Sequence, residues 1–89
     1  MGAYAFTQRG TMSELDHIIR KASLAKRGGW GVQSTGEKLA SALVLNRPDW
    51  IAAMDYTLAE AIDRVGPEWL ALIPTAERTL RDEADSDAE

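Results

Sequence analysis

Six residues in the first half of the chain have the types and spacing that anion binding requires. The segment 26–31 (KRGGWG) is a glycine-rich turn beside two cations, and a helix start follows it at Ser34. Backbone N–H groups in such a turn and at a helix N-terminus can hold a phosphate, and an indole ring offers a base a stacking face. The candidate anion-binding or partner-binding residues are Arg20, Lys21, Lys26, Arg27, Trp30 and Lys38.

The same segment also has a purely structural interpretation. Cations followed by glycine are typical of the last turn of a helix, and Trp30 could fold back on the core. The spacing matches neither the Walker A pattern nor the dinucleotide-binding GxGxxG pattern. The sequence therefore leaves open whether this turn binds an anion or only ends a helix.

The side chains on which most enzymes and metal sites depend are scarce. His17 is the only histidine and there is no cysteine. No pair of carboxylates is placed for acid–base catalysis. We therefore expect a protein that is not an enzyme, with no metal site and no cofactor.

Four aromatic residues form a second candidate set for partner binding. Trp50 and Trp69 each follow a Pro-Asp or Pro-Glu pair, so they should lie just inside short helices that begin with proline. They could be core anchors or interaction hot spots. Tyr4 and Phe6 lie in an N-terminal arm that we expect to dock on the core or on a second copy of the chain.

The charges of the chain are segregated along its length. Residues 1–48 carry seven cations and three acids, a net charge of +4, whereas residues 49–89 carry three arginines and eleven acids, a net charge of −8. Such a division produces either attraction within the molecule or separate basic and acidic faces for partners. An acidic face could occupy the nucleic-acid groove of another protein.

A repeat with an offset of nineteen residues organises the middle of the chain. When residues 35–54 are aligned with residues 54–73, six of twenty positions are identical and four are conservative. Each copy contains a helical pattern, then a proline, then a tryptophan, which predicts two similar helical hairpins. Segments 39–45 with 49–54, and 58–65 with 67–73, should superpose, with Trp50 and Trp69 in matching places.

Apolar spacing and capping patterns place the helices. Capping boxes, in which a Ser or Thr and a Glu three residues later satisfy each other's backbone N–H groups, are expected at Thr11 with Glu14, Ser34 with Glu37, and Thr57 with Glu60. Pro74 should end the fifth helix and Thr75 should begin the sixth. The expected helices span about 12–27, 35–45, 49–54, 58–65, 67–73 and 75–82.

These patterns predict an all-α fold of five or six short helices. The domain should span residues 11–82, preceded by an arm over 1–10 and followed by a disordered acidic tail over 83–89. No segment has the length and apolarity of a membrane span, so we expect a cytoplasmic protein without membrane association.

The function expected from the sequence is protein binding. The size, acidity and lack of cysteine are typical of small bacterial or phage accessory proteins, so we expect an inhibitor or adaptor whose partner is another protein, for instance a nucleic-acid-binding one. A homodimer is a further expectation. The alternative is a nucleic-acid or phosphate-binding module that uses the basic Trp30 loop.

Overall fold

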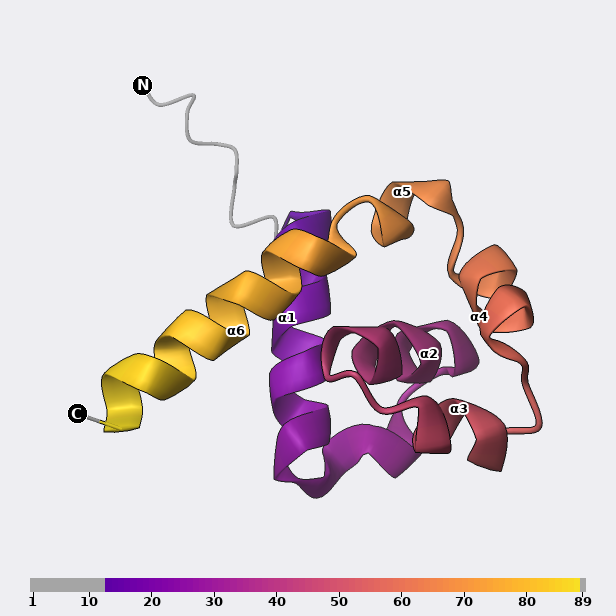
Figure 1. Cartoon of the computed structure of the whole chain (residues 1–89), viewed down its shortest axis with the longest axis horizontal. Coiled ribbons are helices and arrows are strands. Elements are labelled where there is room, and N and C mark those ends of the chain that lie inside the picture. Colours follow the sequence, from indigo (N-terminus) through magenta and orange to yellow (C-terminus); the bar gives the residue numbers. More distant parts are fainter. Residues whose placement is uncertain (1–12, 89) are drawn as a thin grey trace.

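Helices make up almost all of the part of the chain that the structure describes (Figure 1). The computed structural model describes residues 13–88, with side chains up to residue 84. Within that range there is no strand, and the all-α prediction is confirmed. The elements are α1 (Glu14–Leu24), the π-helical turn η2 (Ala25–Gly29), the 3₁₀ turn η3 (Trp30–Val32), α2 (Thr35–Val44), α3 (Pro48–Ala53), α4 (Leu58–Val65), α5 (Pro67–Leu70) and α6 (Ile73–Ala88).

Helix α2 is the centre of the fold, as its nearly continuous apolar sequence predicts. It contacts α1, α3, α4 and α6. Its first turn is fixed by the predicted capping box, in which the Glu37 N–H donates to Ser34 Oγ over 3.3 Å and the Ser34 N–H donates to Glu37 Oε1 over 3.1 Å. Half of its ten residues are buried: Leu39, Ala40, Ser41, Ala42 and Val44.

Two apolar clusters lie against α2. In the first, Val44 packs with residues from α1 and α6, namely Ile18, Ala22, Ala76 and Leu80. In the second, residues of α2 pack with α3 and α4, and its buried members are Leu39, Ala42, Ile51 and Ala61. The two repeated tryptophans are divided between them, because Trp69 packs against the first cluster and Trp50 against the second.

Three other predicted helix ends are confirmed. The capping box at α4 forms, with the Glu60 N–H donating to Thr57 Oγ1 and the Thr57 N–H donating to Glu60 Oε1. Gly28 takes the left-handed conformation that ends the first helical run, with φ of 102°. Gly66 ends α4 with φ 90° and ψ 159°, a region open essentially only to glycine.

The predicted capping box at Thr11 is wrong. Helix α1 begins two residues later than expected, and its N-cap is Ser13, whose Oγ accepts from the Asp16 N–H over 3.1 Å. Ser13 is as good an N-cap as threonine. Glu14 is therefore the first helical residue, and its carboxylate instead accepts a hydrogen bond from the Trp69 indole N–H.

The boundary between the fifth and sixth helices also differs from the prediction. Helix α5 is only four residues long, and α6 begins at Ile73, so Pro74 lies in the first turn of α6 instead of breaking a helix. Proline is tolerated there because the first backbone N–H groups of a helix have no intrahelical partner.

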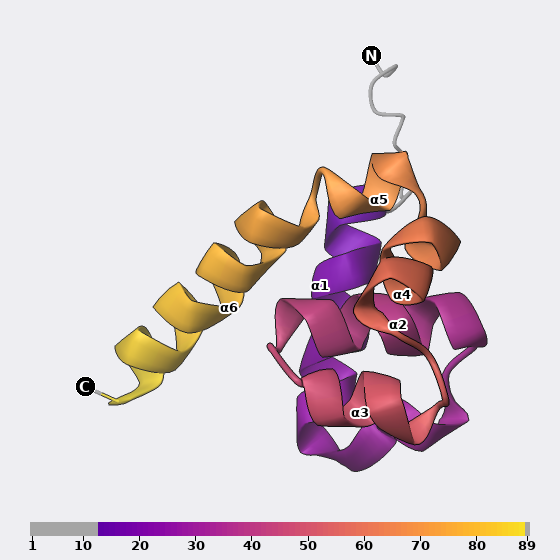
Figure 2. The same cartoon turned by 45° about the vertical axis from the view of Figure 1, so that its right-hand side comes forward.

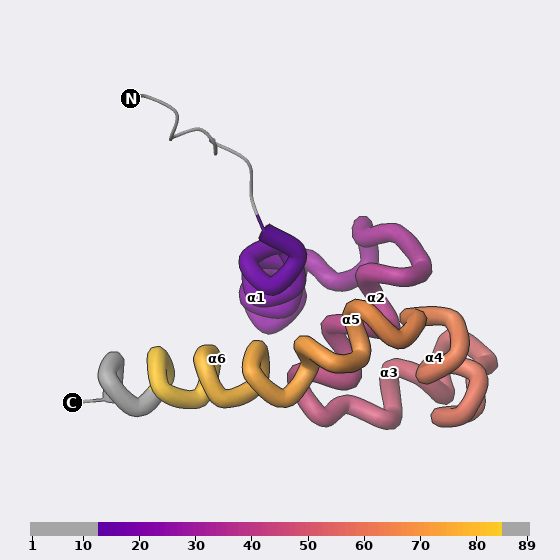
Figure 3. The backbone as a smooth tube through the Cα atoms, turned by 90° about the horizontal axis from the view of Figure 1, so that it is seen from above, coloured from indigo at the N-terminus to yellow at the C-terminus, as the bar shows by residue number. Residues whose placement is uncertain are grey.

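Helix α6 continues through most of the segment for which we predicted disorder. Its backbone is helical to Ala88, whereas we expected a tail over 83–89; the disorder of that tail stays a prediction. Alanine and glutamate favour helix, and the Arg81 and Glu77 side chains pair one turn apart at 3.1 Å. Figure 2 shows the last turns of α6 leading away from the other helices, and Figure 3 shows the preceding turns of α6 passing α1.

Both repeated hairpins contain the predicted pair of contacting helices, α2 with α3 and α4 with α5. Their turns differ. Three residues join α2 to α3, with Asn46 at φ 56°, whereas Gly66 alone joins α4 to α5. The equivalent of Asn46 in the second copy is Val65, which is helical. The superposition of the hairpins remains a prediction, and it does not extend to these turns.

None of the helices between residues 13 and 88 combines the length and the apolar composition needed to cross a membrane.

Candidate functional site

The six candidate anion-binding residues do not converge on one site. Arg20, Lys26 and Arg27 are exposed along α1 and η2. Lys21 instead faces α2, where its Nζ lies 3.7 Å from Oε2 of Glu37. Lys38 lies over the ring of Trp30, with Nζ 5.3 Å from the ring centroid.

Glu37 joins α1 to the start of α2. Its Oε2 is 2.9 Å from Nε2 of His17, and because an ionised carboxylate only accepts hydrogen bonds, the imidazole must donate. Burial alone would raise the pKa of Glu37. The hydrogen bonds from the Ser34 backbone and from His17, with the charge of Lys21, outweigh burial and lower that pKa below its ordinary value of 4.5. The carboxylate thus neutralises part of the predicted basic site.

Trp30 is packed against the protein. Its indole N–H donates to the Lys38 carbonyl over 2.9 Å, and its ring centroid lies 4.7 Å from that of Trp50, with the ring planes tilted by 32°. Arg47 lies over Trp50 at 4.4 Å and is held by two hydrogen bonds to Asp49, of 3.0 and 2.7 Å. The contacts of Trp30 favour its structural interpretation, because Trp50 and Lys38 already lie against the ring on which a base would stack.

The second candidate set is also divided. Trp50 is half-buried against Trp30 and the second apolar cluster. Trp69 is half-buried against the first cluster, and its ring lies 5.5 Å from the ring of His17. Tyr4 and Phe6 lie outside the described residues. Both tryptophans therefore contribute to packing between helices, as the core-anchor interpretation predicts.

The outer side of α4 carries a surface that the sequence did not single out. Leu58 and Ile62, one turn apart, are 55% and 44% exposed. Leu58 also borders a shallow hollow formed with the end of α2 and the start of α3, where Leu43 and Pro48 contribute to the wall. Adjacent aliphatic side chains exposed to this degree mark a surface that another molecule can cover.

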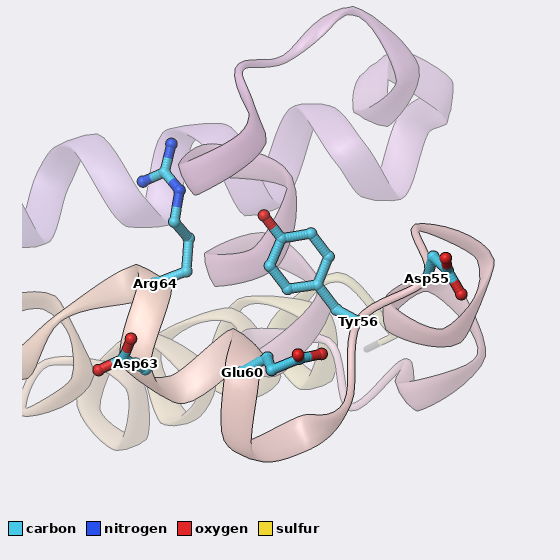
Figure 4. Close-up of a pocket in the computed structure, with 5 residues that line it drawn as sticks. All are labelled: Asp55, Tyr56, Glu60, Asp63 and Arg64. Carbon is cyan, nitrogen blue, oxygen red and sulfur yellow. The ribbon is translucent and has the colours of Figure 1, made fainter.

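A second hollow, lined largely by acidic residues, lies beside the same helix. Figure 4 shows the Tyr56 ring rising from the loop before α4, while Glu60, Asp63 and Arg64 come from α4 itself. Asp55 directly precedes Tyr56 in that loop, and its backbone is left-handed, with φ 66°. Three carboxylates and one guanidinium line this hollow, and Figure 4 shows Asp55 and Asp63 at its opposite ends.

The charge around α4 is strongly negative. Residues 49–72 contain five carboxylates and a single arginine, a net charge of −4. We call the exposed aliphatic pair Leu58 and Ile62 the α4 face. The hollow lined by Asp55, Glu60 and Asp63 lies on another side of the same helix, because Glu60 is two residues away from both Leu58 and Ile62. The aliphatic pair suits an apolar partner segment, and the negative charge of the region around it favours a cationic one.

Comparison with known proteins gives no family for this chain. It matches no family model, no curated protein and no solved structure. The function must therefore be inferred from the site.

No group of three or more His, Cys, Asp or Glu side chains that could hold a metal ion occurs in the described part of the chain.

The sequence carries a signal for the α4 face, but this signal is equally typical of a core face. Leu58, Ala61, Ile62 and Val65 share one side of the helix, as expected for a buried face. Only Ala61 is fully buried, and Val65 is half-buried. The apolar stripe is wider than the contact with α2, and its outer edge is left in solvent.

Proposed function

We propose that this chain is a small protein-interaction module, of the inhibitor or adaptor type, that binds a partner through the α4 face. The observation that carries the proposal is the exposure of Leu58 and Ile62 one turn apart on a helix with acidic surroundings. Covering such a pair contributes binding free energy in proportion to the apolar area buried, while the carboxylates guide the choice of partner.

The partner should present cations beside aliphatic side chains. A second α4 face is a poor partner, because two surfaces with the same negative charge repel each other. A basic amphipathic helix supplies both features and is a common ligand for an apolar groove. A protein that itself binds nucleic acid carries such cations, so occupation of its binding surface is an inhibitor mechanism consistent with this chemistry.

We propose no enzymatic role. The only imidazole of the chain is engaged by Glu37 and packs beside Trp69, so the described side chains offer no histidine that is free to act as the base of a nucleophile.

The nucleic-acid or phosphate-binding alternative has weaker support. Lys21 is paired with Glu37, and Trp30 packs against Trp50, which leaves Arg20, Lys26 and Arg27 as its exposed cations. A gel-shift series at low salt tests it, since phosphate contacts give strongly salt-dependent binding. Binding that is lost on Lys26→Glu with Arg27→Glu would favour this alternative.

The α4 proposal is tested by capture from a lysate of the source organism with a matched set of variants. Leu58→Asp with Ile62→Asp should reduce recovery of the captured protein at least about tenfold, equivalent to roughly 1.4 kcal/mol. Leu24→Asp is the control, because Leu24 is a leucine of similar exposure (41%) on α1. Recovery that the α4 substitutions leave unchanged would contradict the proposal.

A further inference from the structure

The last two turns of α6 lie beyond its packing against the body. The helix is anchored by Ala76 and Leu80, which are buried against α1 and α2. It then continues to Ala88, and Figures 1 and 2 show this part diverging from α1. Leu80 and the half-buried Ala84 lie one turn apart at the start of the divergence. An apolar edge therefore leads out of the core along α6.

The charge of these turns is unfavourable in an isolated monomer. Four acids lie in the part of α6 after Arg81, namely Asp82, Glu83, Asp85 and Asp87. The C-terminal end of a helix carries the negative end of its dipole and is stabilised by cations, not by carboxylates. Arg81 is the nearest cation on the helix, and it pairs with Glu77. After Arg81, the end of α6 therefore has no cation on its own helix to stabilise it.

Suitable cations lie across a cleft. Lys26, Arg27 and Ser23 form one wall of a hollow whose other wall is Leu80, Glu83 and Ala84 of α6. A second hollow shares Lys26, Leu80 and Ala84 and extends to Val44 and Leu45 at the end of α2. Among the described side chains, the ion pairs of the protein include neither Lys26 nor Arg27. We call the space between α6 and these residues the α6 cleft.

We propose that the α6 cleft is a homodimer interface that receives the acidic end of α6 from a second copy. The acids of each α6 would lie against Lys26 and Arg27 of the other copy, and the Leu80–Ala84 edges would pack together. The arrangement is isologous, because each copy contributes one acidic helix end and one basic cleft. The opposite charges of the two halves of the chain then attract across the interface.

This interface is separate from the α4 face. Figure 1 places α4 at one side of the molecule and the end of α6 at the other. A dimer through α6 therefore leaves both α4 faces open, and its existence does not depend on the function proposed for α4. If both proposals hold, the dimer is a bivalent binder, with higher avidity for a partner that repeats its binding segment.

The test is a charge-swap experiment on the full chain, followed by sedimentation equilibrium. The cleft variant has Lys26→Glu and Arg27→Glu. The helix variant has Asp82→Lys, Glu83→Lys, Asp85→Lys and Asp87→Lys. Arg20→Glu is the control, because Arg20 is an exposed cation of α1 outside the cleft. Circular dichroism establishes that each variant remains helical.

The wild type and the Arg20→Glu control should form a concentration-dependent dimer that weakens as salt is raised. Each charge variant alone should be monomeric, since its α6 and its cleft then carry the same charge. An equimolar mixture of the two variants should form a heterodimer, because each then offers the charge that the other needs. A wild type that stays monomeric at every concentration, with α6 held by its own cations, would overturn the proposal. The proposal would also be overturned if the cleft variant still formed the dimer, or if the mixture of the two variants formed no heterodimer.

Discussion

Replacing Glu37 with alanine should destabilise the protein by more than the loss of a helix cap. Three contacts meet on this carboxylate. It accepts from the Ser34 N–H at 3.1 Å, it accepts from the His17 imidazole at 2.9 Å, and it lies 3.7 Å from the Lys21 ammonium. The last two contacts connect α1 to α2, so their loss weakens packing between helices as well as the end of α2.

The expected magnitude follows from these contacts. The exposed hydrogen bond from the Ser34 N–H, which is the half of the capping box that Glu37 supplies, contributes about 1 kcal/mol. The hydrogen bond from His17 to the charged carboxylate contributes about 1.5 kcal/mol, and the partly exposed ion pair with Lys21 about 0.3 kcal/mol. Glu37→Ala should therefore lower the free energy of unfolding by roughly 2 to 3 kcal/mol. For a domain of this size the midpoint of thermal unfolding should fall by roughly 10 to 20 °C.

Glu60→Ala is the matched control. Glu60 makes the same capping box at α4, and among the described side chains it has no histidine or lysine partner. Its loss should cost only about 1 kcal/mol. Glu37→Gln should fall between the two. Its single amide oxygen can still accept from the Ser34 N–H, but its NH2 group cannot accept from His17, and the charge that pairs with Lys21 is lost.

Urea unfolding at neutral and acidic pH measures these differences. The pKa of Glu37 is lowered by folding, so the stabilisation from its charge is present above the unfolded pKa and is lost as pH falls through the folded pKa. The difference in free energy of unfolding between the wild type and Glu37→Ala should therefore become smaller at acidic pH. Equal costs for Glu37→Ala and Glu60→Ala at neutral pH would refute the assigned role of His17 and Lys21.

Three further substitutions test the packing. Gly66→Ala should cost roughly 1 to 3 kcal/mol, because no other residue readily adopts its backbone; an unchanged urea midpoint would contradict that conformation. Trp30→Phe removes the indole N–H bond to the Lys38 carbonyl and should cost about 1 kcal/mol in the same assay, with a reduced near-ultraviolet dichroism signal; an unchanged signal would argue against the Trp30–Trp50 contact. Leu80→Ala should lower the free energy of unfolding by roughly 2 to 4 kcal/mol and increase amide exchange along α6. Unchanged exchange along α6 would contradict the role of Leu80 as its anchor.

The parts of the fold that local rules determine were predictable from the sequence. The capping boxes at Ser34 and Thr57 begin α2 and α4 where expected, and a glycine after the cations, Gly28, ends the first helical run. Local rules failed where two of them compete. Ser13 and Thr11 are both good caps, and Pro74 can either end a helix or lie in its first turn. Tertiary packing decides between such alternatives, and it is not encoded in a short window.

The candidate site was harder to predict for the same reason. Apolar periodicity shows that Leu58 and Ile62 share a face with Ala61, but not how much of that face α2 covers. A cluster of positive residues likewise does not reveal that Lys21 faces Glu37. The division of charge along the chain was visible in the sequence, while its meaning depends on which helices lie side by side.

Photo-crosslinking along the protein tests the central claim most directly. A benzophenone amino acid at Ala59, an exposed position of α4 between Leu58 and Glu60, should crosslink to the captured partner. The same group at Arg20 on α1 should not. Partner crosslinks at position 59 that disappear with Ile62→Asp are the result we predict. Crosslinks that form at position 20 and not at position 59 would contradict binding through the α4 face.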